Sequence, residues 1–209
     1  MPTFLDTDGY KFSMAAAGFP LREETFYYSH RKGGPHYLPF DPKVEVLRLI
    51  PNPASLTESK SYLSGTSYEM SKAFWSAFDS GALRISSIPQ FSWFFDREPV
   101  FSISGPSALV SWLEPLVLQL RYRIQIATLA LLDPARLQEE IAVVSSEEQK
   151  SLIKQTLADI RFRKEVTIEV NSDMYLSRVC ARTKEIADLL GDPARFFEVG
   201  MRSVSCPTQ

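Results

Sequence analysis

The longest apolar segment of the chain, residues 109–132, limits the folds that are open to it. A membrane-spanning helix needs about 20 consecutive and predominantly apolar residues. Here the run is interrupted by Glu114, Pro115, Arg121 and Arg123, so we predict a buried helical region and no membrane span. Because proline lacks an amide hydrogen and kinks a helix, residues 108–132 are expected to form one helix kinked at Pro115 or two helices.

Strands are predicted on the N-terminal side of this region. Residues 23–30 are rich in threonine and aromatic residues, which favour strands. Residues 82–104 place apolar residues among serine and proline, and turn sequences follow at 96–99 and 105–106, so we interpret them as a strand-rich module. Residues 43–50 fit neither the helical nor the strand period cleanly, and both structures are open there.

Helix signals accompany these strands. Residues 10–17 are good helix formers, with Asp6 and Asp8 as capping candidates and Gly18 as the stop. A second helix is predicted within residues 67–79, where three apolar side chains are spaced four apart: Met70, Phe74 and Phe78.

The C-terminal part of the chain predicts helices followed by α/β elements. Asp133, before a proline, and Ser146, in a capping box, each signal a helix start. Residues 165–170 alternate as a half-buried strand does, and residues 176–190 carry one apolar helical face. Residues 196–200 (Phe-Phe-Glu-Val-Gly) are typical of a buried strand of an α/β core. Because a lone buried strand leaves unpaired edges, we expect another segment or another chain to cover it.

The charge balance disfavours one class of partner. The chain has 23 basic and 25 acidic side chains, a formal net charge of -2 and no basic tract, so nucleic acid is not a predicted partner. Cys180 and Cys206 make neither a metal site nor a disulfide framework. The N-terminus carries no secretory signal, and a cytoplasmic location is the default expectation.

Two segments are candidate anion sites. Residues 29–34 (Ser-His-Arg-Lys-Gly-Gly) follow a predicted strand, and cationic side chains before two glycines can offer charge and backbone N–H groups to a phosphate. A solvated turn is the alternative, and His30 on its own is more often structural than catalytic. In residues 198–202, Gly200 lets a ligand approach the backbone and Arg202 supplies a planar fork for an anion. The alternative there is an arginine solvated at a strand end.

Other chemistry is weakly signalled or absent. Asp6 and Asp8 could form a carboxylate pair, although helix capping explains them more simply. Tyr10 is by default an ordinary core or surface aromatic residue, and Cys206 has no histidine near it in the sequence. We find no phosphate-binding P-loop, dinucleotide fingerprint, nucleophile elbow or metal-ligand spacing.

Three segments together resemble the nicotinate phosphoribosyltransferase family. Residues 6–14 (Asp-Thr-Asp-Gly-Tyr-Lys-Phe-Ser-Met) resemble its opening motif, in which Thr-Asp, one variable residue and Tyr-Lys precede a methionine. Residues 26–32 (Phe-Tyr-Tyr-Ser-His-Arg-Lys) look like the next strand, which ends in Arg-Lys. Residues 197–202 (Phe-Glu-Val-Gly-Met-Arg) are similar to the first barrel strand, commonly Glu-Phe-Gly-Xaa-Arg. Their order and spacing fit the family over essentially the whole chain.

The resemblance implies an enzyme of NAD salvage. The family transfers a ribosyl phosphate from phosphoribosyl pyrophosphate to the nitrogen of nicotinate and releases pyrophosphate, usually with coupled ATP hydrolysis, so Mg²⁺ and ATP are the implied cofactors. Departure of the leaving group builds positive charge on the sugar and negative charge on pyrophosphate. Catalysis therefore rests on positioning and on electrostatic stabilisation.

The resemblance also implies site residues shared between two chains of a homodimer. Tyr10 would reach in from the partner subunit to stack on the pyridine ring, and Arg31 would meet the phosphates across the dimer. Gly200 and Arg202 would hold the pyridine substrate, or the phosphate of its product, at the barrel mouth. Val199 departs from the pattern, since relatives often carry a stacking phenylalanine there. No residue of the chain matches the histidine that the family phosphorylates, so no catalytic residue and no metal ligand is assigned.

The fold implied by the resemblance is α+β. A discontinuous N-terminal sandwich domain is expected over residues 1–105, a helical region with one strand over 106–190, and the start of a type II phosphoribosyltransferase α/β barrel over 191–209. Family members run to roughly twice this length, beyond what one core usually supports, and the additional part holds the rest of the barrel. The chain alone is therefore expected to be inactive. The alternatives are a non-catalytic dimerisation or binding module, one half of a split enzyme, and, less well matched, a quinolinate-specific enzyme.

Overall fold

The computed structural model describes residues 3–18, 21–79, 83–144 and 146–160, together with 177, 180–181, 183–185 and 188–189. Helices and short antiparallel sheets combine in these residues, which places the chain in the α+β class, as predicted. The elements are α1 (Gly9–Ala16), β1 (Glu23–Tyr28), β2 (His36–Tyr37), α2 (Pro42–Arg48), α3 (Pro53–Leu63), α4 (Lys72–Asp79), β3 (Arg84–Ser87), β4 (Trp93–Phe94), β5 (Phe101–Pro106), α5 (Ser107–Trp112), α6 (Glu114–Leu132), α7 (Pro134–Ile141) and α8 (Glu147–Asp159).

The larger sheet has the strand order β1-β5-β3 and is antiparallel throughout. Its central strand β5 pairs Phe101 with Tyr28 of β1 and with Ser87 of β3. Along β5 buried and half-buried residues alternate, as expected of a strand with one face on the core. A second sheet pairs β2 with β4. The predicted strands at 23–30 and within 82–104 are thereby confirmed.

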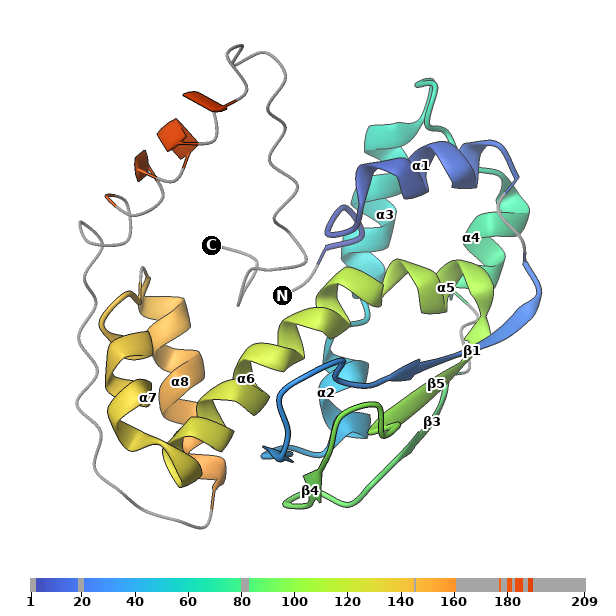
Figure 1. Cartoon of the computed structure of the whole chain (residues 1–209). Helices are drawn as coiled ribbons and strands as arrows, with labels where there is room; N and C mark the ends of the chain where they lie inside the picture. Colours follow the sequence, from blue (N-terminus) through green and yellow to red (C-terminus); the bar gives the residue numbers. More distant parts are fainter. Residues whose placement is uncertain are drawn as a thin grey trace.

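Helix α6 joins two parts of the molecule (Figure 1). Helix α5 packs on β1 and β5, and α6 continues past β2 to contact α7 and α8. The region 108–132 forms two helices rather than one kinked helix, with the break at Leu113 and with Pro115 in the first turn of α6, where its missing N–H is harmless. No helix within the described ranges is long and apolar enough to cross a membrane.

Side-chain caps define most of the remaining helix starts. Asp133 accepts a hydrogen bond from the Arg136 amide, and Ser146 accepts one from the Gln149 amide, which confirms both predicted starts. Asp41 caps α2, so the ambiguous residues 43–50 are largely helical. Helix α3 was not predicted, although its Asn52-Pro53 start is a recognisable signal.

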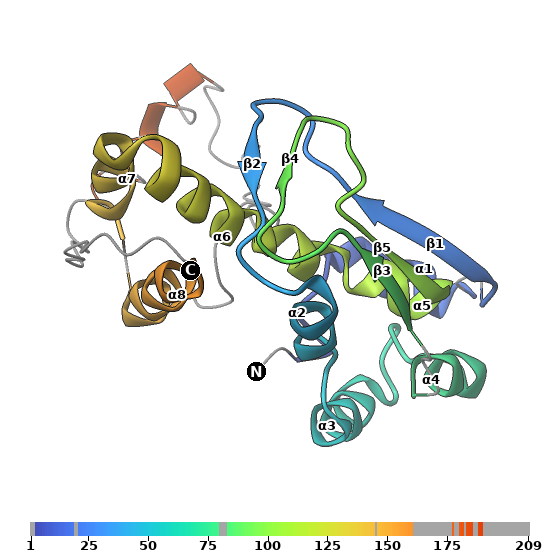
Figure 2. The same cartoon turned by 90° about the horizontal axis from the view of Figure 1, so that it is seen from below.

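Two hydrophobic cores stabilise the described residues. The first contains Phe4, Phe101 and Trp112, and therefore includes residues from both sides of position 105. Met70, Phe74 and Phe78 are all buried in it, as their spacing predicted. The second core lies between α6, α7 and α8. Figure 2 shows α7 and α8 at the end of α6 remote from α3 and α4.

The predicted strands at 165–170 and 196–200, and with them the barrel strand, lie outside the described residues. The described residues between 177 and 189 are helical, in keeping with the helix expected over 176–190. The division at 105/106 and 190/191 stays a prediction.

Candidate functional site

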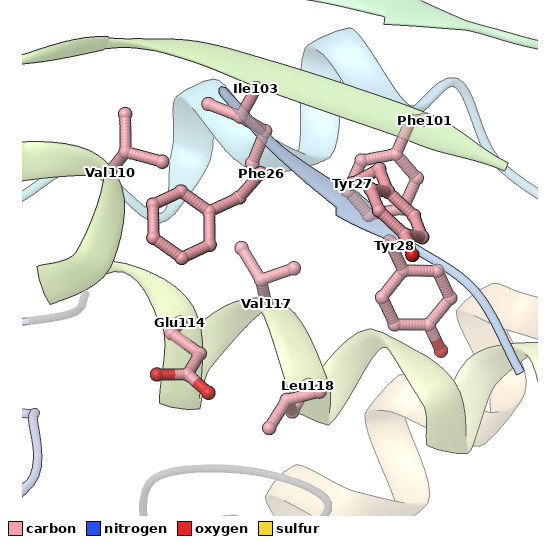
Figure 3. A pocket seen from close by; sticks show the side chains of 9 residues that line it. All are labelled: Phe26, Tyr27, Tyr28, Phe101, Ile103, Val110, Glu114, Val117 and Leu118. Carbon is pink, nitrogen blue, oxygen red and sulfur yellow. The ribbon is translucent and has the colours of Figure 1, made fainter. Parts of the chain in front are cut away.

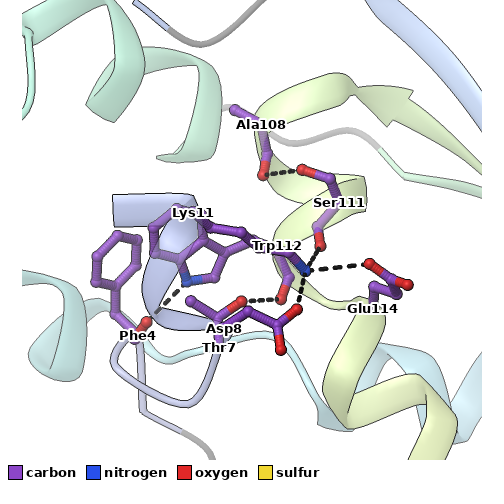
Figure 4. A network of polar contacts seen from close by, with 8 residues as sticks. All are labelled: Phe4, Thr7, Asp8, Lys11, Ala108, Ser111, Trp112 and Glu114. Carbon is purple, nitrogen blue, oxygen red and sulfur yellow. Dashed lines mark hydrogen bonds and ion pairs between the residues drawn. The ribbon is translucent and has the colours of Figure 1, made fainter. Parts of the chain in front are cut away.

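The opening segment is fixed to the junction of α5 and α6 by a buried lysine. The Lys11 side chain is only 2% exposed, and its Nζ lies 2.6 Å from the carbonyl oxygen of Ser111, 3.2 Å from Glu114 Oε2 and 3.3 Å from Asp8 Oδ2 (Figure 4). Ser111 belongs to the last turn of α5, where carbonyl groups lack helical N–H partners and the helix dipole favours a cation. Lys11 therefore joins two helices that are far apart in the sequence.

Neutral hydrogen bonds reinforce this attachment. The Thr7 hydroxyl donates to the carbonyl oxygen of Trp112 over 3.0 Å, and the Trp112 indole N–H donates to the carbonyl oxygen of Phe4 over 2.7 Å. The rings of Phe4 and Trp112 stack with centroids 4.5 Å apart. Residues 4–11 are thus held by polar and by aromatic contacts together.

The same short helix presents other side chains to solvent. Tyr10 is 53% exposed and Met14, one turn later, is 44% exposed, while Lys11 and Ala15 are buried. Residues four apart lie on one helical face, so Tyr10 and Met14 share the outward face. One face of α1 is therefore buried against the rest of the fold, and another face is exposed to solvent.

The capping prediction for the two N-terminal aspartates was wrong. Asp8 occupies the N-cap position of α1, but its carboxylate makes no capping hydrogen bond and pairs with Lys11 instead. Asp6 accepts a hydrogen bond from the Thr3 amide at 2.6 Å. A buried ammonium group is more costly to leave unpaired than a helix N–H group near solvent, which explains why the Asp8 carboxylate turns to it.

The turn after β1 places its charged side chains outward. Arg31 and Lys32 are exposed, whereas His30 is buried. Gly33 has a φ of 87° and its N–H donates to Asp96 Oδ2 at 2.9 Å, so this amide is not free for a phosphate. A Cβ at Gly34 would come within 3.3 Å of backbone atoms of Phe95 and Asp96, which explains the second glycine by close packing.

Two histidines lie beneath this turn. His30 Nε2 and the Tyr28 hydroxyl are hydrogen-bonded at 2.8 Å, and the rings of His30 and His36 are 4.1 Å apart. Burial lowers the pKa of His30 to about 4, and the nearby His36 and Arg121 act in the same direction. His30 is therefore neutral at pH 7 and has a structural position.

A cationic pocket of about 250 Å³ opens beside the turn. Lys32 reaches it from the turn, Arg121 and Gln125 from α6, and Arg136 from α7. The sequence analysis missed the α6 and α7 residues because they are about ninety to one hundred positions away in the chain. The signal available was the spacing of Arg121 and Gln125, which are four residues apart and therefore lie on one face of α6.

An apolar hollow of about 150 Å³ lies between β1, β5 and the α5–α6 region (Figure 3). Phe26 and Tyr27 of the edge strand β1 line it, and Tyr27 is 67% exposed. Glu114 borders the hollow and also binds Lys11, so the hollow adjoins the attachment of α1. The hollow lacks the converging polar groups of a catalytic site, but its aromatic rim is suited to contact with another chain.

The predicted site residues are only partly placed. Tyr10 lies on α1 and Arg31 in the turn after β1, and these segments occupy separate parts of the molecule in both overall views (Figures 1 and 2). Gly200 and Arg202, with the departure at Val199, lie outside the described residues.

No group of three or more His, Cys, Asp or Glu side chains that could hold a metal ion occurs among the described residues.

Comparison with known proteins gives a limited result. No family model matches the chain, and no curated protein matches its sequence. Among solved structures, human nicotinic acid phosphoribosyltransferase matches with a TM-score of 0.45 and 26% identity over 58% of this chain. The match covers 26% of the human protein, so the chain spans about a quarter of that length.

Proposed function

We propose that this chain is part of a nicotinate phosphoribosyltransferase, which forms nicotinate mononucleotide and pyrophosphate from nicotinate and phosphoribosyl pyrophosphate. The observation that carries the proposal is the contrast between two neighbouring residues of α1. Lys11 is buried and bound by three oxygen atoms, and its neighbour Tyr10 is displayed to solvent. This contrast suits the opening motif to which residues 6–14 are similar.

The length of α1 determines how it can be stabilised. A helix of eight residues is too short to be stable by itself in water. Burying an ammonium group is unfavourable unless it is fully paired, and the Lys11 ammonium is paired with three oxygen atoms. These contacts hold the short helix on the rest of the fold. The result is a fixed direction for Tyr10, and a rigid exposed aromatic ring is suited to stack on a flat heteroaromatic ring such as that of nicotinate.

In this proposal Tyr10 acts in the site of a partner chain. An exposed side chain on the surface of one subunit can contribute to catalysis only where another surface meets it. The apolar hollow beside Glu114 and the exposed edge strand β1 support such a contact, because edge strands and aromatic patches favour association. A homodimer with shared sites is therefore part of the proposal.

In this proposal Arg31 and Arg202 would bind the charged groups of the substrates and products. The bond from the ribose C1 to pyrophosphate breaks and the bond from C1 to the nicotinate nitrogen forms, with positive charge on the sugar in between. Exposed Arg31 offers a planar fork to phosphate oxygens, and Arg202, near Gly200, would hold an anionic group of the pyridine substrate or product. The expected barrel at 191–209 and the coupling to ATP belong to the same proposal.

The test is complementation in trans. The 209-residue chain is co-purified with a nicotinate phosphoribosyltransferase whose own opening-motif tyrosine has been changed to alanine, and formation of nicotinate mononucleotide is measured. We expect no product from either chain alone and recovered activity from the mixture. Tyr10→Ala should abolish the recovery, whereas Tyr62→Ala, at a 72% exposed tyrosine on α3, should leave it intact.

The outcome separates the proposal from its rivals. A stable mixed complex without activity would favour a non-catalytic dimerisation module. Equal recovery with Tyr10→Ala would remove Tyr10 from the site. Transfer to quinolinate instead of nicotinate would identify the other enzyme class.

A further inference from the structure

We propose that the pocket between the β1–β2 turn, α6 and α7 binds a small phosphate-class oxyanion, inorganic phosphate or pyrophosphate. Lys32, Arg121 and Arg136 would supply the charge, and Gln125 would supply a neutral donor. This site lies within residues 30–136, so it requires neither the barrel nor a partner chain. It is therefore independent of the proposed function.

Three cationic side chains line one pocket, and no aspartate or glutamate is among its lining residues. Within the described ranges, none of the three cations forms an ion pair. Like charges facing one cavity repel each other, and a bound dianion would relieve that repulsion.

The Asp96 carboxylate, in the loop after β4, contacts residues that line the pocket. Asp96 Oδ2 accepts from the Gly33 amide at 2.9 Å, and Asp96 Oδ1 lies 3.4 Å from His36 Nε2. His36 also lines the pocket, and at that distance its buried Nε2 makes no hydrogen bond. The Asp96 carboxylate is therefore already engaged beside the pocket, and the His36 Nε2 makes no hydrogen bond among the described residues.

Arg121 and Arg136 come from different helices, and each guanidinium carries a planar set of N–H donors that matches the oxygens of a phosphate. Lys32 adds a compact charge from the turn, and Gln125 lies one helical turn after Arg121. The cations that line this pocket therefore come from three different elements, the turn, α6 and α7.

The volume of the pocket favours a small phosphate ligand. Pockets for drug-sized molecules typically measure about 300–1,000 Å³, and this pocket measures about 250 Å³. One phosphate or a pyrophosphate suits that volume better than a whole nucleotide.

The experiment titrates the 209-residue chain with inorganic phosphate and, separately, with pyrophosphate at constant ionic strength, by calorimetry and by ³¹P NMR. We expect saturable binding of at least one of them. Arg121→Ala and Arg136→Ala should each weaken it at least about tenfold, because a charge-assisted hydrogen bond is lost. Lys32→Ala should weaken it in the same direction. Arg84→Ala, at a 71% exposed arginine on β3 outside the pocket, is the matched control and should leave the dissociation constant unchanged.

Each alternative result overturns the inference. A titration that never saturates would exclude a built site. Equal weakening by Arg84→Ala and by the pocket variants would show that binding follows overall charge only. Thermal unfolding of every variant is measured in parallel, and Lys32→Ala, on an exposed turn, keeps the test valid if a helix variant fails to fold.

Discussion

The Lys11 ammonium donates to the carbonyl oxygen of Ser111 at 2.6 Å, across one hundred positions of the sequence. This contact ties the first helix to the end of α5, and the Asp8 and Glu114 carboxylates neutralise the charge there. The placement of α1, and with it the exposed position of Tyr10, therefore depends on a bond that its neighbour makes. Stability and function at this helix can therefore be separated by mutation of adjacent residues.

Lys11→Met should destabilise the fold, whereas Tyr10→Ala should not. Removing the ammonium leaves the Asp8 carboxylate in a half-buried place without its cation, so we expect a loss of about 3 kcal/mol in the free energy of unfolding. Tyr10→Ala, at an exposed position, should change it by less than about 0.5 kcal/mol. Urea unfolding of both variants measures the difference. Equal stabilities would mean that the Lys11 network contributes little to folding.

Two arginines on α6 should behave in opposite ways. Arg123 is buried, forms a 2.7 Å ion pair with Glu45 and lies over the Phe40 ring at 4.7 Å. Arg123→Ala should therefore lower the free energy of unfolding by about 3 kcal/mol, whereas Arg121→Ala, on the exposed side, should lower it by less than about 0.5 kcal/mol. Denaturant unfolding at pH 7 checks both values. A mild Arg123→Ala phenotype would show that the ion pair barely offsets its own desolvation.

His30 should make the fold sensitive to acid. Its pKa is lowered from 6.5 to about 4, so below pH 6.5 the unfolded chain takes up a proton that the folded chain does not. The stability associated with His30 is therefore complete above pH 6.5 and is lost as the pH falls towards 4, by up to about 3 kcal/mol.

The matched variant is His30→Gln, which cannot titrate in this range. We expect the free energy of unfolding of the original chain to fall more steeply than that of His30→Gln between pH 6.5 and 4. Urea unfolding at several pH values gives both slopes. Parallel slopes would show that His30 is protonated without disturbance of the fold.

Arg31 and Lys32 should separate the two proposed anion functions. Arg31 is exposed and does not line the cationic pocket, while Lys32 does. Arg31→Ala should lower kcat/KM for phosphoribosyl pyrophosphate by about tenfold in the complementation assay and leave phosphate binding to the pocket intact. Lys32→Ala should weaken the pocket and spare transfer. If both variants impair both measurements, the turn serves one site instead of two.

Local sequence signals predicted the elements whose causes are local. Phe74 and Phe78 lie on a buried helical face because a repeat of four residues matches the helical turn. Asp133 and Ser146 begin helices because their side chains reach amides three residues away. The strand at residues 23–28 and the exposed turn after it were likewise predicted from composition and glycines.

The tertiary structure decided what depends on contacts between distant residues. A capping role for Asp8 was expected from its position before α1. The Asp8 carboxylate instead pairs with the buried Lys11 ammonium, because an ammonium group cannot be left unpaired in an apolar environment. The cationic pocket likewise appeared only when α6 and α7 brought Arg121 and Arg136 to the turn that carries Lys32. Sequence patterns report interactions within a few residues, whereas burial and converging charge arise from the packing of whole elements, which no local period encodes.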